Sequence, residues 1–234
     1  MKAFAIVIKG HPLSEYGYSV LKESSEKVGN TFEIEKFDAY DVMRAHDFVT
    51  RSENPVHWSY PWKGEEVSIP LGLKMKAYAT STSAYARVGC FLSHYHLWKK
   101  SVELDEDVLI LEHDAYFLKQ YHAPIAMRHH AMSLNDPRGA TRKAQVYHDK
   151  LQSGAGNPVE CPWIDDDRAI PQGLPGNSAY VIGPGMAQRA IDFVAKHGAW
   201  PNDALLCKQN FPNALWCLKD YATTIQGLGS TTTG

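Results

Sequence analysis

Two short runs of consecutive apolar residues constrain the fold of this chain most. They cover residues Phe4–Ile8 and Val108–Leu111, and neither shows the alternation of apolar and polar side chains typical of a half-exposed strand. A third run, Ala179–Ile182, has the same character. Strands of this kind are buried on both faces, as in parallel sheets covered by helices. The sequence therefore predicts an α/β fold with a mostly parallel, Rossmann-like sheet flanked by helices.

Segments with helical periodicity alternate with these strands. A helix that begins at Ser14 and stops at Gly29-Asn30 leads to a strand over residues 32–37, which gives a βαβ opening typical of nucleotide-binding folds. A second helix, starting near Gly89, carries apolar residues spaced by three or four. A third helix precedes Gly198, which suits a C-terminal cap.

The region richest in loop-forming residues lies in the second half of the chain. Residues 119–175 are polar and rich in Gly and Pro, which predicts long loops over the strand ends. A chain of 234 residues fits one large α/β domain, so we expect residues 1–234 to form a single domain.

Composition and charge narrow the class of protein. The formal net charge of -2 lacks the basic excess of a typical nucleic-acid-binding protein. The four cysteines form no Cys-x-x-Cys pair, which indicates buried thiols in a reducing compartment. The apolar run at Phe4–Ile8 is too short for a signal sequence or a membrane-spanning helix. We therefore expect a cytoplasmic protein with no integral membrane segment.

The most informative polar residues follow the run Val108–Leu111. In an extended chain Glu112 and Asp114 point to the same side, about 7 Å apart over two residues, and His113 points away. Open α/β sheets bind ligands at the carboxyl ends of such strands. Paired carboxylates there suit Mg²⁺ or Mn²⁺, which complete their shells with water and substrate phosphates. The alternative is that these acids merely end the strand and cap the next segment.

Three parts of the chain share the motifs of one known family. The run Val88–His94, Val-Gly-Cys-Phe-Leu-Ser-His, precedes Leu109–Asp114, as a G-C-x-x-S-H helix precedes an I-L-E-D-D strand end in that family. Asn177–Ile182, followed by Pro201-Asn202-Asp203, is similar to its G-x-x-A-Y-x-I segment and its later Pro/Asp motif. Ala5–Ile8 with Ser14 looks like its first strand and helix start. The chain thus resembles glycosyltransferase family 25, which includes lipooligosaccharide and collagen galactosyltransferases, except roughly over residues 40–80 and 120–170.

The resemblance implies a GT-A-type fold and an inverting transfer of a hexose-like sugar. The donor would be a nucleoside-diphosphate sugar, with a UDP-sugar favoured. The cofactor would be Mn²⁺ or Mg²⁺, which would offset charge on the departing diphosphate. The default acceptor is a lipopolysaccharide-type glycan, and the absence of a membrane anchor fits a bacterial or viral cytosolic enzyme.

The resemblance also implies roles for individual residues. Asp114 would bind the metal directly, Glu112 would contact metal, ribose or ordered water, and Asp203 would be the general base or bind the acceptor. The residues implied in nucleotide-sugar binding are Ile8, Lys9, Ser93, His94 and His113, and those implied in acceptor binding are Asn177, Tyr180 and Asn202.

One departure from the family pattern keeps other functions open. His113 stands where the family usually has a second Asp, which supports a binding module of the same fold that has lost catalysis. A metal-dependent phosphohydrolase could use the same carboxylates. Within the transferase class, a protein or a modified nucleic-acid base is an alternative acceptor to a glycan.

Overall fold

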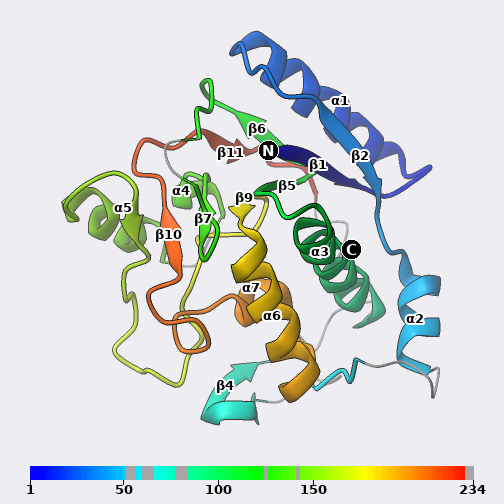
Figure 1. Ribbon diagram of the computed structural model, residues 1–234, viewed down its shortest axis with the longest axis vertical. Helices are drawn as coiled ribbons and strands as arrows, with labels where there is room; N and C mark the ends of the chain where they lie inside the picture. Colours follow the sequence, from blue (N-terminus) through cyan, green and yellow to red (C-terminus); the bar gives the residue numbers. More distant parts are fainter. Residues whose placement is uncertain (51–55, 60–65, 77–83, 124–125, 141–142, 230–234) are drawn as a thin grey trace.

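A mixed β-sheet forms the centre of the protein (Figure 1). The structure is a computed structural model that describes residues 1–50, 56–59, 66–76, 84–123, 126–140 and 143–229. Within these residues the central sheet has seven strands, which lie side by side in the order β2 (Ile34–Asp38), β1 (Lys2–Val7), β5 (Val108–Glu112), β9 (Ala179–Ile182), β7 (Ala131–Ser133), β10 (Leu215–Cys217) and β8 (Val159–Glu160). All run in one direction except β9 and β8. The expected mostly parallel α/β sheet is confirmed.

Helices flank this sheet, and the chain also forms two small two-stranded sheets. The helices are α1 (Pro12–Lys27), α2 (Val42–Thr50), α3 (Ala84–Leu104), α4 (Pro137–Ala140), α5 (Ala144–Ser153), α6 (Pro184–His197) and α7 (Asn202–Leu205), with a short 3-10 turn η1 (Pro70–Gly72). The small sheets pair β3 (Glu66–Ile69) with β4 (Leu73–Lys76), and β6 (Ala115–Phe117) with β11 (Thr223–Ile225). No helix in the described parts of the chain is both long and apolar enough to cross a bilayer.

The two faces of the sheet are buried in two separate apolar cores. In β5, Val108 and Ile110 belong to the core that contains α3 and α6, which lie side by side in Figure 1. Leu109 and Leu111 belong to the opposite core, which also takes in Leu21 of α1. Burial of each such side chain contributes about 1.5–3 kcal/mol. The run Val108–Leu111 of β5 lacks polar residues because both of its faces are covered.

The structure differs from the sequence expectations at some element ends. The cap of α1 is His11, whose Nδ1 accepts a hydrogen bond from the Ser14 backbone N–H at 3.4 Å. Ser14 instead uses its hydroxyl to accept from the Ile8 backbone N–H at 2.9 Å, which ties the helix to the end of β1. Pro12 at the first helical position explains why the helix starts early. Residues 119–175 also contain β7, α4, α5 and β8 between their loops, because these elements are too short to show a period.

Gly89 allows α3 to approach the chain that follows β2. A Cβ atom at this position would overlap the carbonyl oxygen of Tyr40. One turn further on, the Ser93 hydroxyl accepts from the Tyr40 backbone N–H at 2.9 Å and donates to the Gly89 carbonyl at 2.8 Å. Gly89 and Ser93 therefore hold the segment after β2 in place.

We expect Gly89→Ala to destabilise the protein by about 1–3 kcal/mol, as overpacking does, although alanine favours an exposed helix. The free energy of unfolding in urea measures this effect. Gly229→Ala is the matched control, since a Cβ there has no atom within 4 Å, and should change stability by less than about 0.5 kcal/mol. Equal effects of the two changes would contradict the close approach at Gly89.

Candidate active site

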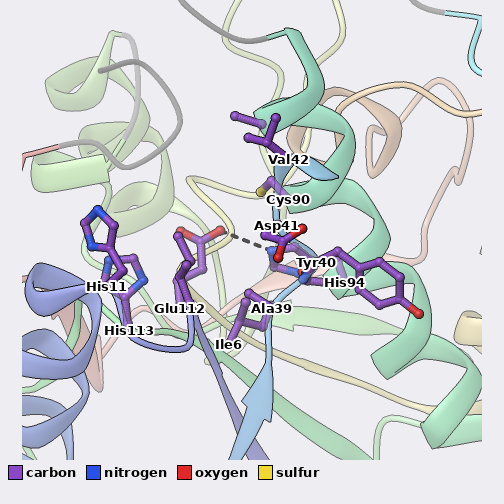
Figure 2. A pocket seen from close by; sticks show the side chains of 13 residues that line it. Ile6, His11, Ala39, Tyr40, Asp41, Val42, Cys90, His94, Glu112 and His113 are labelled. Atoms are coloured by element: carbon purple, nitrogen blue, oxygen red, sulfur yellow. Dashed lines mark hydrogen bonds and ion pairs between the residues drawn. The ribbon is translucent and has the colours of Figure 1, made fainter. Parts of the chain in front are cut away.

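A pocket lies at the carboxyl ends of the parallel strands β2, β1 and β5 (Figure 2). Its volume is about 780 Å³, part of which is open to solvent. Its walls come from four parts of the chain: Ile6, Ile8 and His11; Ala39, Tyr40, Asp41 and Val42; Ala86, Cys90, Ser93 and His94; and Glu112 and His113. Parallel strands bring their carboxyl ends to one edge, so residues far apart in sequence meet here.

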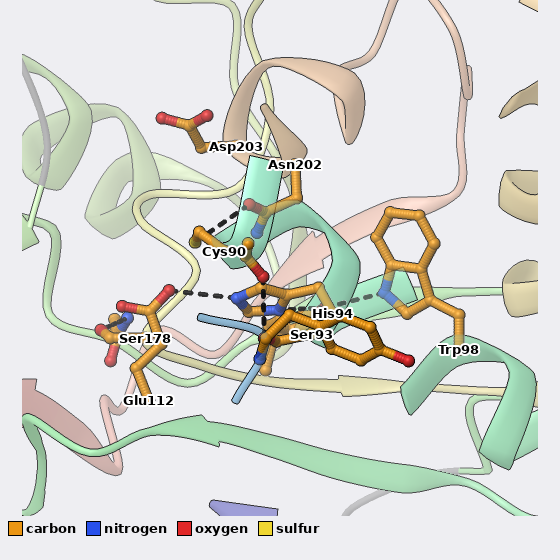
Figure 3. A network of polar contacts seen from close by, with 12 residues as sticks. Cys90, Ser93, His94, Trp98, Glu112, Ser178, Asn202 and Asp203 are labelled. Carbon is orange, nitrogen blue, oxygen red and sulfur yellow. Dashed lines mark hydrogen bonds and ion pairs between the residues drawn. The ribbon is translucent and has the colours of Figure 1, made fainter. Parts of the chain in front are cut away.

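Glu112 points from the end of β5 toward α3. Side chains alternate along a strand, so Glu112 lies on the same face as Val108 and Ile110, whose side chains face that helix. The Glu112 Oε1 atom lies 3.1 Å from Nε2 of His94, which is fully buried (Figure 3). Burial would raise the pKa of Glu112, but the hydrogen bond from His94, followed by the electrostatic influence of His94 and His113, outweighs it and lowers the pKa. Glu112 is therefore a carboxylate at neutral pH.

His113 does not point away from Glu112, and the expectation from strand alternation is wrong here. β5 ends at Glu112 and the chain turns at His113 and Asp114, so His113 lines the same pocket. Figure 2 shows its ring beside that of His11. Burial lowers the pKa of His113 despite the opposing charge of Glu112, which favours a neutral imidazole in the pocket wall.

Asp114 lies just behind this pocket wall. Its Oδ1 atom is buried and has no hydrogen-bond partner among the described residues. Burial, and then the charge of Glu112, raise the pKa of Asp114 to about 7. A buried oxygen without a donor is costly for the protein alone, which makes this atom suited to a bound cation.

Asn177 carries a second set of buried polar atoms without partners. The Glu112 backbone N–H donates to the Ser178 carbonyl at 2.8 Å, so Asn177 lies beside the turn that follows Glu112. Its side chain is 6% exposed, and within the described residues neither its oxygen nor its nitrogen has a hydrogen-bond partner. An amide in this state is prepared to bind a ligand group.

Asp203 and Asn202 come from α7, next to α3. The Asn202 Oδ1 atom accepts a hydrogen bond from the Cys90 thiol at 3.7 Å, and Asn202 is buried. Asp203 is exposed, yet the protein around its carboxyl group and then the charge of Glu112 raise its pKa. Figure 3 shows its side chain directed away from Asn202. The expected base is thus on the rim of the same charged site as Glu112.

The remaining expected residues divide between the pocket and its surroundings. Ile8 lines the pocket, whereas Lys9 is exposed and outside its lining. Ser93 reaches the pocket wall, but its hydroxyl is engaged by Tyr40 and Gly89. Tyr180 is fully buried behind His94, so its ring offers no surface to an acceptor in this structure. Its position indicates a supporting role instead.

Two groups of side chains could bind a metal ion. Cys90, His94 and Glu112 offer sulfur, nitrogen and oxygen atoms within 4.8 Å of one another, a set that suits zinc. However, burial and the charges of Glu112, Asp203 and Asp114 raise the pKa of the Cys90 thiol well above its usual range. Both ring nitrogens of His94 also have partners. The oxygens of Glu112 and Asp114 fit a hard cation better.

Several pocket residues were not singled out from the sequence. Tyr40, Asp41 and His11 come from loops after β2 and β1, where no periodic pattern marks a residue. The signal that could have found them is their place directly after strands expected at the centre of the sheet.

Comparisons with known proteins identify the family of the chain. A family model described as "Glycosyltransferase family 25 (LPS biosynthesis protein)" matches residues 21–151. No curated protein matches the chain. A crystal structure of an active-site mutant of LgtC has a TM-score of 0.46 and 10% identity, covering 98% of this chain and 88% of that one. A structure of the galactosyltransferase LgtC with donor and acceptor sugar analogs has a TM-score of 0.44 and 9% identity, covering 97% and 87%. With scores this low, the chemistry rests on the chain's own residues.

A contact behind the pocket residue Tyr40 leads to a prediction about the pH dependence of stability. His96 stacks on Tyr40 with its Nε2 atom 2.8 Å from the Tyr40 hydroxyl, and burial, then the charges of Lys99 and Arg44, lower its pKa to about 4. The unfolded chain therefore binds more protons between pH 6.5 and 4, and stability falls as the pH decreases through that window.

We expect His96→Gln to remove this contribution to the loss of stability in acid. After allowance for solvent near the ring, the contribution is about 1–2 kcal/mol of unfolding free energy. Urea unfolding of both proteins at pH 7 and pH 4.5 measures it. A difference in stability between variant and wild type that is the same at both pH values would contradict the assignment.

Proposed function

Because the chain belongs to glycosyltransferase family 25, we propose that it transfers a hexose-like sugar from a nucleoside-diphosphate sugar to an acceptor hydroxyl. The observation that carries this proposal is the electrostatic coupling of three acids around the end of β5. Glu112 lines the pocket, and its charge raises the pKa of Asp114 and also that of Asp203, which comes from a distant part of the sequence. One buried oxygen of Asp114 is without a donor among the described residues. We propose that residues 1–234 act as one GT-A-type domain.

The nucleotide part of the donor fits the apolar half of the pocket. Ile6, Ile8 and the Tyr40 ring provide apolar and aromatic surface for a base, and Asp41 provides a carboxylate that can accept hydrogen bonds. Figure 2 shows Asp41 and Glu112 directed toward the pocket from opposite walls. We favour a UDP-sugar as the donor.

The residues around Asp114 fit a divalent cation. Asp114 would hold Mn²⁺ or Mg²⁺ through its buried Oδ1, and Glu112 would contribute through the oxygen that His94 does not bind. Such an ion neutralises the charge that develops on a leaving diphosphate. The protein itself places the carboxyl groups of Glu112 and Asp114 at the end of β5 and keeps that of Glu112 ionised.

The acceptor would approach from the side of α7. Asp203 is the exposed acid there, and we propose that it removes the proton from the attacking hydroxyl, on the face opposite the leaving group, as inversion requires. Asn177, with its unpartnered amide, would bind an acceptor hydroxyl. We propose a lipopolysaccharide-type glycan as the acceptor, supported by the family's description. We also propose a cytoplasmic location.

The proposal predicts Mn²⁺-dependent release of nucleoside diphosphate from one member of a panel of nucleotide sugars. Asp114→Asn keeps the shape but removes the charge, and we expect it to lower this release by about 100-fold or more. Asp149→Asn is the matched control, because Asp149 is exposed on α5 and bonds only to Gln145 among the described residues.

Two results would replace the proposal with another function. Tight binding of a nucleotide sugar without turnover, for every acceptor offered, would identify a binding module, with His113 as the first residue to revert to Asp. Hydrolysis of simple phosphate esters that depends on Asp114 would identify a phosphohydrolase.

A further inference from the structure

A chain of three hydrogen bonds runs from the core to the pocket (Figure 3). The Trp98 indole N–H donates to the Tyr180 hydroxyl oxygen at 2.8 Å. That oxygen lies 2.9 Å from Nδ1 of His94, and Nε2 of His94 lies 3.1 Å from Oε1 of Glu112. Trp98, Tyr180 and His94 are all fully buried. Water therefore has no access to the Trp98–Tyr180 and Tyr180–His94 bonds, whereas Glu112 lies at the pocket.

The direction of each bond follows from what the groups can donate. An indole nitrogen can only donate, so the Tyr180 oxygen accepts from Trp98 and retains its own proton. If the hydroxyl donates that proton to Nδ1 of His94, Nε2 carries the imidazole proton and donates it to the Glu112 carboxylate. This arrangement satisfies every donor in the chain.

The opposite arrangement leaves groups unpaired. If Nδ1 carried the proton, it would have to donate to Tyr180, whose own hydroxyl proton would then have no acceptor in a buried site. The lone pair of Nε2 would also face Glu112, which would have to take up a proton to make a bond. An unpaired buried donor costs about 1–3 kcal/mol.

We propose that Trp98 and Tyr180 fix His94 in the Nε2-protonated tautomer, so that it permanently donates to Glu112 and sets the direction of that carboxylate. His94 is thus a positioning residue, and Tyr180 acts through it. The consequence for metal and donor binding rests on the proposed function, whereas the tautomer does not. The network also makes His94 a donor, which excludes it as a metal ligand in this state.

The tautomer can be measured without substrate or metal. In protein labelled with ¹⁵N at histidine, the protonated and unprotonated ring nitrogens have different shifts, and His94→Gln identifies the signals of His94. We expect protonated Nε2 and unprotonated Nδ1 in the wild type. Tyr180→Phe removes the donor to Nδ1. In this variant we therefore expect the His94 signals to move toward the values for a mixture of tautomers. Protonated Nδ1 in the wild type would overturn the inference.

A matched hydroxyl elsewhere controls for loss of packing. Tyr121 is also buried, it belongs to the core on the opposite face of the sheet, and its hydroxyl has no partner among the described residues. Tyr121→Phe should leave the His94 signals unchanged. If both tyrosine changes moved these signals equally, the effect of Tyr180 would be a general loosening of the core.

Two substitutions of His94 separate positioning from packing. Glutamine can place an amide N–H where Nε2 lies and still donate to Glu112, whereas the shorter asparagine reaches only the Tyr180 side. Substitution of a residue that supports a metal ligand typically lowers metal affinity by about 10–100-fold. We expect His94→Gln to keep Mn²⁺ affinity within a few-fold of wild type and His94→Asn to lose about 10-fold or more.

The free Mn²⁺ signal in electron paramagnetic resonance measures this affinity. Equal losses in the two variants would assign His94 to packing alone and overturn the positioning role. A wild type that binds no Mn²⁺ would contradict the proposed function, while the ¹⁵N spectra would still decide the tautomer.

Discussion

The packing of α3 against the face of β5 and β9 is the constraint on which the rest of the structure depends. Trp98 and Tyr180 meet in this interface, fully buried, and their polar atoms bond to each other instead of to water. The same contact fixes the rotation of α3 about its axis. Its consequence is that Gly89 and Ser93 touch the chain after β2, while Cys90 and His94 face the pocket.

The two carboxyl groups at the end of β5 differ in pKa because their surroundings differ. Glu112 is held ionised by a buried donor, whereas burial and then the charge of Glu112 raise the pKa of neighbouring Asp114 to about 7. Two carboxyl groups on one strand end thus have different properties. The proposed cation would offset the repulsion from Glu112 that contributes to the raised pKa of Asp114.

The strands were predictable because their burial is a local property of the sequence. Phe4–Val7 and Ala179–Ile182 are apolar throughout, and the structure places both in strands covered on each face. The position of His113 was not predictable in the same way, because alternation applies only while a chain stays extended. The strand stops one residue earlier than the argument assumed, and the turn brings His113 to the pocket.

The sequence by itself determined the fold class, the family and the acidic cluster at the end of a central strand, since each depends on residue types and spacings along the chain. Only the tertiary structure decided that His94 bonds to Glu112, that Tyr180 supports His94 from behind, and that the loop carrying Tyr40 and Asp41 closes the pocket. His94 and Tyr180 alone lie 86 positions apart in the sequence. Their contact depends on how a helix packs across several strands, and no local pattern encodes that packing.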